Sequence, residues 1–359
     1  MDVFDALREN KHEQVVFCSD PPAGLRAIIV IHNTTLGPAI GGTRMMPYSS
    51  EEDALADALR LSRLMTFKAA AAGLNFGGGA SVIIGDPKKD KSEALFRSLG
   101  RFIDDLNGRY ISAEGMGTTV QDMDWVHMET NHVMGLTGAS GDPSPMCAYG
   151  AYHGIRACVE EALNTTSLEG LKVAIQGVGN VGSLLVEMFA AEQCEIYVSE
   201  INRETLDRVR EQYSVHVVDP EEIYDLPVDI FCPCALGGIL NGETIPRLRC
   251  TVVAGVANNQ LKEDRHGDDL FKRGILYAPD YVINAGGLIN VAYELEGPYD
   301  EELAKRKTEA IYRVLKEIFA MSRQKVIPTH QAADRMAQQR IDSVNRLREG
   351  YFPSMCPSP

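Results

Sequence analysis

The stretch Leu171–Gly182 reads LKVAIQGVGNVG and places three spaced glycines directly after an apolar run. The run predicts a β-strand, and the apolar periodicity beyond the glycines predicts a helix. Gly177, Gly179 and Gly182 thus form G-x-G-x-x-G at a strand-to-helix turn. Glycines there let the backbone approach a pyrophosphate closely, and free N–H groups at the helix N-terminus would hold it. The stretch therefore predicts a Rossmann unit that binds a dinucleotide.

An acidic residue follows this glycine turn at roughly the 20-residue spacing of the fingerprint. Glu200 comes at the end of the next apolar run. Its carboxylate would accept hydrogen bonds from the adenosine ribose hydroxyls and repel a 2′-phosphate, so we expect NAD rather than NADP. Arg203 lies nearby and weakens that preference. The turn residues Asn180 and Val181 complete the predicted cofactor site, for which a glycine turn in an unrelated unit is the less favoured alternative.

Two domains are expected. Strand and helix patterns alternate after residue 148, which is typical of a doubly wound parallel sheet. Gly, Ser and Pro cluster in Gly135–Pro145, as in a loop or hinge. A chain of 359 residues is also longer than one hydrophobic core usually serves. The predicted fold is α/β, with an N-terminal α/β domain of residues 1–135 and 330–359, a doubly wound Rossmann domain of residues 140–325, and a cleft between them.

Shorter patterns predict the individual elements. In the N-terminal domain a helix is expected after the cap residue Ser50, and the glycine-rich segment Gly37–Arg44 predicts a loop. Further elements there are strands at Val15–Cys18, Leu25–His32, Val82–Ile84 and Tyr110–Ala113 and a helix at Ala94–Leu106. The Rossmann domain should add strands at Glu195–Val198, Val228–Phe231, Thr251–Ala254 and Ile275–Tyr277 and helices at Ala148–Ala162, Val181–Gln193, Arg203–Tyr213 and Glu301–Met321. A last helix is expected at Ala332–Arg348.

The composition excludes several classes of function. The formal net charge of −15 argues against a nucleic-acid or anionic-membrane partner, because both require a basic face. There is no apolar run long enough to span a membrane and no signal-peptide pattern at the N-terminus, so we expect a cytoplasmic protein. The eight cysteines are scattered, and the pair Cys232 and Cys234 has neither redox C-x-x-C spacing nor a second ligand pair for zinc. No metal site is expected.

One lysine stands in an unusually apolar setting. Lys68 lies within Met65–Leu74, which otherwise carries no charge. A buried lysine needs a partner, so either an anionic ligand or an internal carboxylate is expected, unless its stem extends to solvent. The glycines Gly77–Gly79 follow, and they permit either a close backbone approach or a flexible turn.

Several segments form one further pattern: Gly41–Arg44, Met65–Lys68 with Ala71–Gly79, Val82–Pro87, Gly177–Val181, Pro233–Gly237, Ala257–Leu261 and Tyr277–Val291. Together they resemble the leucine dehydrogenase-like members of the Glu/Leu/Phe/Val (amino-acid) dehydrogenase superfamily, from Met1 to about Arg348. The resemblance implies an NAD-linked enzyme that interconverts an L-amino acid with its 2-oxo acid and ammonia. It also implies an N-terminal substrate and oligomerisation domain, and a homo-oligomer, either an octamer or a dimer.

The resemblance assigns roles to individual residues. Lys68 matches the lysine that holds the substrate carboxylate, and Asn258 matches an asparagine near the substrate and the nicotinamide. Cys147 and Ala235 fall beside the cofactor. The pocket wall would comprise Ile40, Gly41, Ala113, Met134, Leu288 and Val291. This apolar wall would suit an aliphatic or aromatic side chain, with ordinary core packing as the alternative for its aliphatic members.

Two departures from the family pattern bear on the chemistry. Ala80 stands where the family has a catalytic lysine, and Gly115 stands where it has an acid/base aspartate. Met134 and Cys147 also replace threonines. Oxidative deamination needs a base and a cation for the step in which water adds to the imine. Since such groups each contribute ~10²–10⁴ in rate, ordinary turnover should be severely impaired. Glu114 is a poor substitute, because adjacent strand residues point to opposite faces.

Three interpretations follow. The first is an NAD(H)-dependent oxidoreductase that reduces an imine derived from a 2-oxo acid, or a cyclic imine, rather than an ordinary deaminating dehydrogenase. Hydride transfer needs only cofactor, substrate and geometry, so the loss of both groups leaves it intact. The second is a catalytically silent homologue that still binds NAD. The third is a leucine dehydrogenase whose active site has been deleted by engineering, which restoring both groups would revive.

Overall fold

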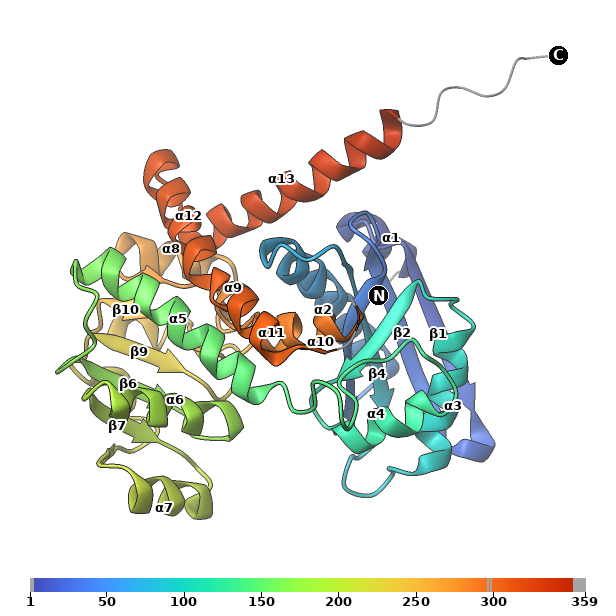
Figure 1. The fold of residues 1–359 in the computed structure, drawn as a ribbon, viewed down its shortest axis with the longest axis horizontal. Helices are drawn as coiled ribbons and strands as arrows, with labels where there is room; N and C mark the ends of the chain where they lie inside the picture. Colours follow the sequence, from blue (N-terminus) through green and yellow to red (C-terminus); the bar gives the residue numbers. More distant parts are fainter. Residues whose placement is uncertain (1–2, 296, 298, 351–359) are drawn as a thin grey trace. The chain divides into compact units, whose positions relative to one another are not determined.

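The computed structural model describes residues 3–295, 297 and 299–350, and it divides into two compact units (Figure 1). The first unit takes in the chain up to Asp142, Val291–Tyr299 and the chain from Met336 onward. The second takes in Pro143–Asn290 and Asp300–Arg335. The sequence boundaries at residues 140 and 330 differ from these by a few residues, and the return of Val291–Tyr299 to the first unit was not expected. The pairing of an N-terminal α/β domain with a Rossmann domain is confirmed.

The first unit is built on a five-stranded mixed sheet. Its strands are β1 (Gln14–Asp20), β2 (Leu25–Asn33), β3 (Ala39–Met46), β4 (Gly77–Ile84) and β5 (Tyr110–Glu114). They lie in the order β1-β2-β4-β3-β5. The β1–β2 and β2–β4 pairs are antiparallel, whereas β3 is parallel to both β4 and β5.

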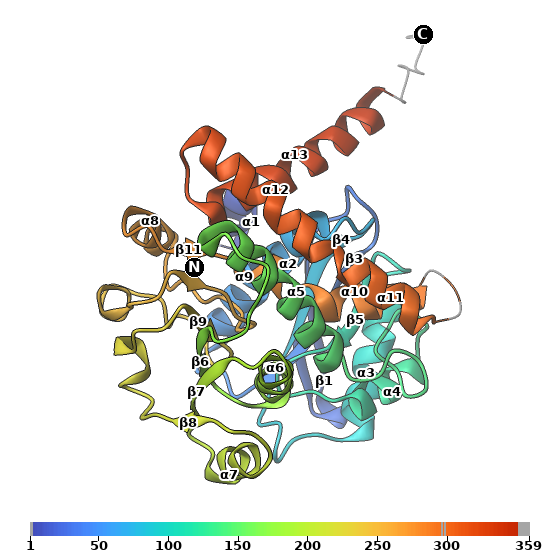
Figure 2. The ribbon, with the colours of Figure 1, turned by 60° about the vertical axis from the view of Figure 1, so that its left-hand side comes forward.

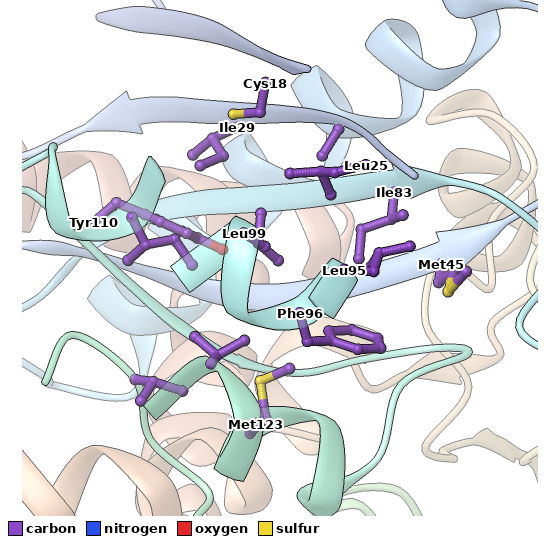
Figure 3. Close-up of a cluster of buried hydrophobic side chains, with 14 of the residues drawn as sticks. Cys18, Leu25, Ile29, Met45, Ile83, Leu95, Phe96, Leu99, Tyr110 and Met123 are labelled. Carbon is purple, nitrogen blue, oxygen red and sulfur yellow. The ribbon is translucent and has the colours of Figure 1, made fainter. Parts of the chain in front are cut away.

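Helices cover both faces of this sheet. One face packs against α2 (Glu51–Ala71), with Ile28, Val30 and Val82 in the shared core and α1 (Val3–Asn10) at its margin. The other packs against α3 (Glu93–Asp104) and α4 (Val120–His127) around Phe96, Tyr110 and Met123 (Figure 3). Neither α1 nor α4 was predicted from the sequence. Because strand side chains alternate, odd-numbered β3 and β4 residues face α3 and α4, and even-numbered ones face α2.

The prediction of a loop at Gly37–Arg44 was wrong, because most of that segment is strand β3 in the interior of the sheet. A Cβ atom at Gly41 would lie 1.8 Å from the carbonyl oxygen of Gly79, and one at Gly42 would lie 2.8 Å from that of Glu114. These glycines therefore permit close strand packing rather than a turn. The glycines Gly77–Gly79 likewise begin strand β4 and do not form a flexible turn.

The second unit holds a six-stranded parallel sheet. Its strands are β6 (Lys172–Gln176), β7 (Glu195–Ser199), β8 (His216–Val217), β9 (Ile230–Pro233), β10 (Val252–Val253) and β11 (Leu276–Tyr277). They lie in the order β11-β10-β9-β6-β7-β8. Read from β8, this is the 3-2-1-4-5-6 order of a Rossmann fold, with the topological switch point between β6 and β9. Ligands of such sheets bind outside the carboxyl ends of the strands at that point.

The second unit also holds the helices that can be followed in Figure 2, where α6 lies beside β6 and β7. They are α5 (Ser144–Leu163), α6 (Asn180–Ala191), α7 (Arg203–Gln212), α8 (Arg265–Lys272), α9 (Asp280–Ile283), α10 (Gly286–Ala292), α11 (Glu301–Thr308) and α12 (Ala310–Lys325). The single helix expected at Glu301–Met321 is thus two helices that part at Glu309. On either side of this break, Thr308 and Ile311 both contact α5 at Gly150, where a Cβ would lie within 3 Å of either side chain.

The last helix, α13 (Thr329–Gly350), passes from the second unit into the first at Met336. Within the first unit its residue Arg340 caps the carboxyl end of α2. The guanidinium donates to the backbone oxygens of Ala70, Gly73 and Leu74 at 3.0, 3.1 and 2.7 Å. A cation at a helix C-terminus is electrostatically favourable, so this contact stabilises the end of α2 that carries Lys68.

Candidate functional site

The glycine turn of the second unit has the geometry that its sequence predicts. Gly177 adopts φ 93°, and a Cβ there would lie 2.7 Å from the Cβ of Ala235. A Cβ at Gly182 would lie 2.1 Å from the Gly177 oxygen. The first position therefore needs glycine for its backbone conformation and for packing against the loop after β9. The third needs it so that α6 can pack onto the turn.

Gly179 differs from its two neighbours in the motif. No described atom lies within 4 Å of the place where its Cβ would be, and the residue is exposed. Helix α6 begins at the next residue, and within the described chain no side chain caps its first turn. Free amide hydrogens and open space beside Gly179 fit a pyrophosphate, which would take up both.

Glu200 is held next to this turn. One carboxylate oxygen accepts the N–H of Val178 at 3.0 Å, and the other accepts the N–H of Asn202 at 2.9 Å. The two oxygens offer about four acceptor positions, so capacity remains for two ribose hydroxyls. Arg203 is exposed at the start of α7. The structure thus brings the glycine turn, Glu200 and Arg203 to the carboxyl ends of β6 and β7.

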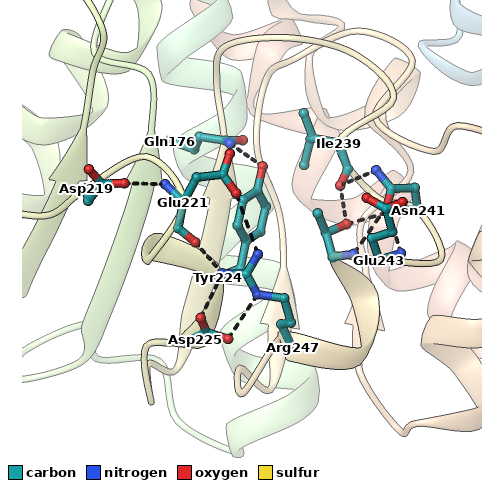
Figure 4. Close-up of polar contacts among 10 residues, drawn as sticks. Gln176, Asp219, Glu221, Tyr224, Asp225, Ile239, Asn241, Glu243 and Arg247 are labelled. Atoms are coloured by element: carbon teal, nitrogen blue, oxygen red, sulfur yellow. Dashed lines mark hydrogen bonds and ion pairs between the residues drawn. The ribbon is translucent and has the colours of Figure 1, made fainter.

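A polar network fixes the end of β6 (Figure 4). Gln176, the last residue of β6, donates its side-chain N–H to the Tyr224 hydroxyl at 2.6 Å. Burial raises the pKa of Tyr224, which keeps this hydroxyl protonated. The guanidinium carbon of Arg247 lies 5.3 Å from the centre of the Tyr224 ring, within the roughly 6 Å limit of a cation–π contact, and the guanidinium also pairs with Asp225 at 2.7 Å. The network lies outside the glycine motif, and no local sequence pattern predicted it.

Asn284 is a further candidate residue that was not predicted from the sequence. Its side-chain N–H₂ donates to the side-chain oxygen of Asn258 at 2.8 Å and to the Val256 oxygen at 3.1 Å. The Asn284 Oδ1 atom is buried and has no hydrogen-bond partner in the described chain. Such an orphaned acceptor fits a ligand that donates an N–H, as a carboxamide would. The available signal was a polar residue in the otherwise small and apolar run from Val282 to Gly287.

Cys147 and Leu288 also belong to the second unit. The Cys147 thiol, half-buried in the first turn of α5, lies 3.7 Å from the Asn284 backbone oxygen. Asn258 is exposed, and Leu288 is buried in α10. Ala235 is exposed beyond the end of β9. The structure therefore gathers the glycine turn with Ala235, and Cys147 with Asn258 through Asn284.

In the first unit, Lys68 and Ala80 lie on one face of the sheet. Gly78 faces α2 so closely that a Cβ would lie 2.1 Å from the Thr66 nitrogen. By alternation Ala80 also faces α2, and it is buried. Lys68 is half-buried in the last turn of the same helix. This face of the first unit therefore lies near a cation, Lys68, and carries an uncharged, buried residue at position 80.

The expected pocket residues are divided by this alternation. Ile40 and Ala113 lie on the face of the sheet that packs against α2. Gly41 is oriented like Thr43, two residues further along β3. The Thr43 hydroxyl is buried with those of Ser81 and Ser112 on the opposite face. Position 41 thus faces the opposite side of the sheet from Ile40 and Ala113.

Val291 lies beside Gly135, the residue that follows Met134. Met134 is buried, with its N–H donating to the Ser112 oxygen at 2.9 Å. A Cβ at the next residue, Gly135, would lie 3.9 Å from the Val291 side chain. Glu294 fixes the arrangement, since its carboxylate accepts the N–H groups of Gly135 and Ser140 at 2.9 and 2.8 Å.

Gly115 lies directly after β5, where the backbone is crowded. A Cβ there would be 2.8 Å from the Thr43 oxygen and 3.1 Å from its carbonyl carbon. The Thr118 hydroxyl bridges the two strands, accepting from the Gly115 N–H and donating to the Thr43 oxygen, both at 2.8 Å. Any side chain at position 115 would therefore require a shift of the backbone.

Glu114 faces away from Ala113 and Ala80. Burial raises the pKa of its carboxyl, with smaller contributions from Asp142 and Asp122. Lys91 opposes this shift and pairs with Asp122 on the α3 and α4 side. Glu114 therefore lies on the opposite face of the sheet from Ala80, as strand alternation predicts.

Two features, a cluster of metal ligands and a membrane-spanning helix, are not found among the described residues. Within residues 3–350, apart from 296 and 298, no group of three or more His, Cys, Asp or Glu side chains is placed to hold a metal ion. Among the helices of the same part of the chain, none is long and apolar enough to cross a membrane.

Comparisons with known proteins agree with this geometry. The family model for the Glu/Leu/Phe/Val dehydrogenase dimerisation domain matches residues 12–132, and the Glutamate/Leucine/Phenylalanine/Valine dehydrogenase model matches residues 195–348. The chain is 55% identical over 355 residues to leucine dehydrogenase from Geobacillus stearothermophilus, covering 98% of this chain and 96% of that protein. It is 47% identical over 362 residues to phenylalanine dehydrogenase from Caldalkalibacillus thermarum, covering 99% and 97%. The crystal structure of L-tryptophan dehydrogenase from Nostoc punctiforme superposes with a TM-score of 0.83 at 46% identity, covering 96% of this chain and 100% of that one.

Proposed function

This chain belongs to the Glu/Leu/Phe/Val dehydrogenase family, and we propose that it is an NAD(H)-dependent oxidoreductase that reduces a preformed imine of a 2-oxo acid rather than deaminating an amino acid. One observation carries the proposal. The glycine turn and Lys68 are present, while the positions that the resemblance matches to the family's lysine and aspartate hold a buried alanine and a glycine with no room for a side chain.

The cofactor would be held by the second unit. The pyrophosphate would lie on the amides beside Gly179, and Glu200 would accept the ribose hydroxyls, which favours NAD over NADP. Asn258, fixed by Asn284, and Cys147 would lie at the nicotinamide end. When bound, the nicotinamide supplies or accepts the hydride.

The first unit would bind the substrate. The ammonium of Lys68 would pair with the substrate carboxylate, and Ile40, Ala113, Met134 and Val291 would accept an aliphatic or aromatic side chain. The substrate class is therefore a small molecule with one carboxylate next to a C=N bond, which is an amino acid, a 2-oxo acid or an imine derived from them.

The absence of a base and a cation affects ammonia release and incorporation, but not imine reduction, although both reactions share a hydride step. Releasing or incorporating ammonia requires water to add to or leave the imine carbon, and that step needs a base and a cation. Ala80 and Gly115 provide neither. A preformed iminium already carries its proton, so hydride addition at carbon gives the amine directly and asks no proton from the protein.

The assay is NADH oxidation with a branched-chain 2-oxo acid, run with ammonia, with methylamine and with a preformed cyclic imine carboxylate. The proposal expects turnover with the preformed cyclic imine and at least 100-fold less with the 2-oxo acid and either ammonia or methylamine, as the loss of groups of this kind implies (about 10²–10⁴). Gly179→Ala serves as the cofactor-site control. Equal turnover with ammonia would contradict the proposal, and NADH binding without any turnover would favour the silent homologue.

We also propose that the chain forms a homo-oligomer, an octamer or a dimer. The support is the match of residues 12–132 to a model described as a dimerisation domain. Light scattering coupled to size-exclusion chromatography measures this directly, and a monomer at micromolar concentration would contradict it.

A further inference from the structure

Two thiols lie in contact at the carboxyl end of β9. The Sγ atoms of Cys232 and Cys234 are 3.5 Å apart. Cys232 is fully buried within the strand, whereas Cys234 is half-buried just beyond it. Side chains two residues apart on a strand point to the same side, which explains the contact across Pro233. Their C-x-C spacing predicted no redox function, so the contact emerges only from the structure.

This pair adjoins the glycine turn. Cys234 donates its backbone N–H to the oxygen of Gln176, the residue before Gly177, at 2.8 Å. The Cβ of Cys234 is 3.4 Å from the place where a Cβ of Gly182 would be. The following residue, Ala235, is the one that packs against Gly177. A displacement of Cys234 would therefore disturb the packing at both Gly177 and Gly182, the first and last glycines of the turn.

We propose that Cys232 and Cys234 are a redox-modification site, in which a peroxide converts the two thiols to a disulfide and thereby weakens nucleotide binding at the glycine turn. The effect on binding rests on the NAD(H) site proposed above. The formation of the bond does not.

The chemistry balances with one equivalent of hydrogen peroxide. The Cys234 sulfur attacks one peroxide oxygen, the O–O bond breaks, and the leaving hydroxide takes up a proton as water. The Cys232 sulfur then attacks the Cys234 sulfenic acid, forming the S–S bond and releasing the second water with the remaining thiol proton. Two electrons pass from the sulfurs to the peroxide.

The order of these steps follows from the surroundings. The contact with Cys234 and burial together raise the pKa of the Cys232 thiol well above its usual value. Cys232 is also less accessible, since it is enclosed in the strand. Cys234 is therefore the thiol that meets the oxidant, and Cys232 resolves the sulfenic acid.

Bond formation would strain the strand end. The sulfurs must approach by about 1.5 Å to reach a bonded distance near 2.05 Å. Cα atoms two residues apart on a strand span roughly 6.6 Å, close to the upper limit of about 6.8 Å for disulfides. Cys232 is fixed by pairing with β6, so the movement falls on Cys234 and Ala235. A strained disulfide is readily reduced, which makes the modification reversible.

The test measures bond formation and nucleotide affinity on the same full-length protein. Trypsin releases residues 211–247, a peptide that contains Cys232 and Cys234 and no other cysteine. After peroxide treatment, this peptide should lose two hydrogens in mass. The NADH dissociation constant should rise roughly tenfold and return on adding dithiothreitol. Cys232→Ser should abolish both changes, with Cys234→Ser as a second variant. The matched control Cys194→Ser removes a half-buried thiol elsewhere in the same unit and should behave as the parent.

Several results would overturn the proposal. These are a crosslink to Cys158 instead, an unmodified 211–247 peptide, a crosslink that leaves NADH affinity unchanged, and continued peroxide sensitivity in Cys232→Ser. The last result would point to Cys147. Failure of the fully reduced parent to bind NADH is a separate outcome, because it removes the nucleotide site itself whatever the mass of the peptide.

Discussion

Replacing Gly179 with alanine tests the nucleotide site without disturbing the fold. Gly179 has φ −66° and ψ −154°, an extended conformation, and a Cβ would meet no described atom within 4 Å. Glycine-to-alanine changes at compatible positions stabilise proteins by about 0.4–1 kcal/mol. The methyl group would, however, occupy the space assigned to the pyrophosphate. Forcing a methyl into a packed contact costs about 1–3 kcal/mol, which corresponds to a roughly 5- to 150-fold weaker NADH complex.

Gly177→Ala provides the matched comparison. Its φ of 93° is unfavourable for alanine by about 1–2 kcal/mol, and its Cβ would overlap Ala235 at 2.7 Å, for a further 1–3 kcal/mol. This variant should therefore lose stability, whereas Gly179→Ala should lose only affinity. NADH fluorescence titrations and urea unfolding on the two variants and the parent separate these effects. Unchanged NADH affinity in a folded Gly179→Ala protein would refute the placement of the pyrophosphate.

Three other predictions concern single residues. Lys68→Met should raise the KM for an imine carboxylate roughly 10- to 100-fold, the loss of one charge-assisted hydrogen bond, while NADH affinity stays constant in fluorescence titrations; an unchanged KM would show that the carboxylate binds elsewhere. Glu200→Gln should narrow the preference for NADH over NADPH about tenfold, because the charge that repels a 2′-phosphate is gone, and equal preference in parent and variant would argue against that role. Burial lowers the pKa of His32, whose ring bonds to the Thr66 hydroxyl at 2.8 Å, from 6.5 to about 4. Between these values the unfolded chain binds a proton that the folded chain excludes, so the free energy of unfolding should fall as pH drops from 6.5 toward 4, by about 3 kcal/mol in all. Urea unfolding of His32→Gln should lack this part of the pH dependence, and parallel profiles for the two proteins would contradict the assignment.

The features that the sequence predicted are those that depend on neighbouring residues. The turn at Gly177 follows from a local pattern, because a positive φ and a tight strand-to-helix connection both require glycine at fixed spacing. Glu200, which directly follows β7, was likewise predicted from its spacing from the glycine turn. The alternation of strands and helices sufficed to predict the parallel sheet, since consecutive elements in such folds lie side by side.

The features that the sequence did not predict depend on residues far apart in the chain. Strand β3 was expected to be a loop because glycine disfavours strands, and only its packing on Gly79 explains why glycine is needed there. The contacts of Asn284 with Asn258 and of Arg340 with the end of α2 likewise join separate segments. The crowding at Gly115 by the Thr43 backbone is of the same kind.

Following the hydride tests most directly whether this protein reduces a preformed imine. The protein is incubated with NADH carrying two deuterium atoms at C4 of the nicotinamide and with a cyclic imine carboxylate, and the amine product is analysed by mass spectrometry. We expect a cyclic amino acid with one deuterium at the former imine carbon, and much less labelled product from a 2-oxo acid with ammonia. Absence of deuterium in the product, or equal labelling from ammonia and the 2-oxo acid, would contradict it.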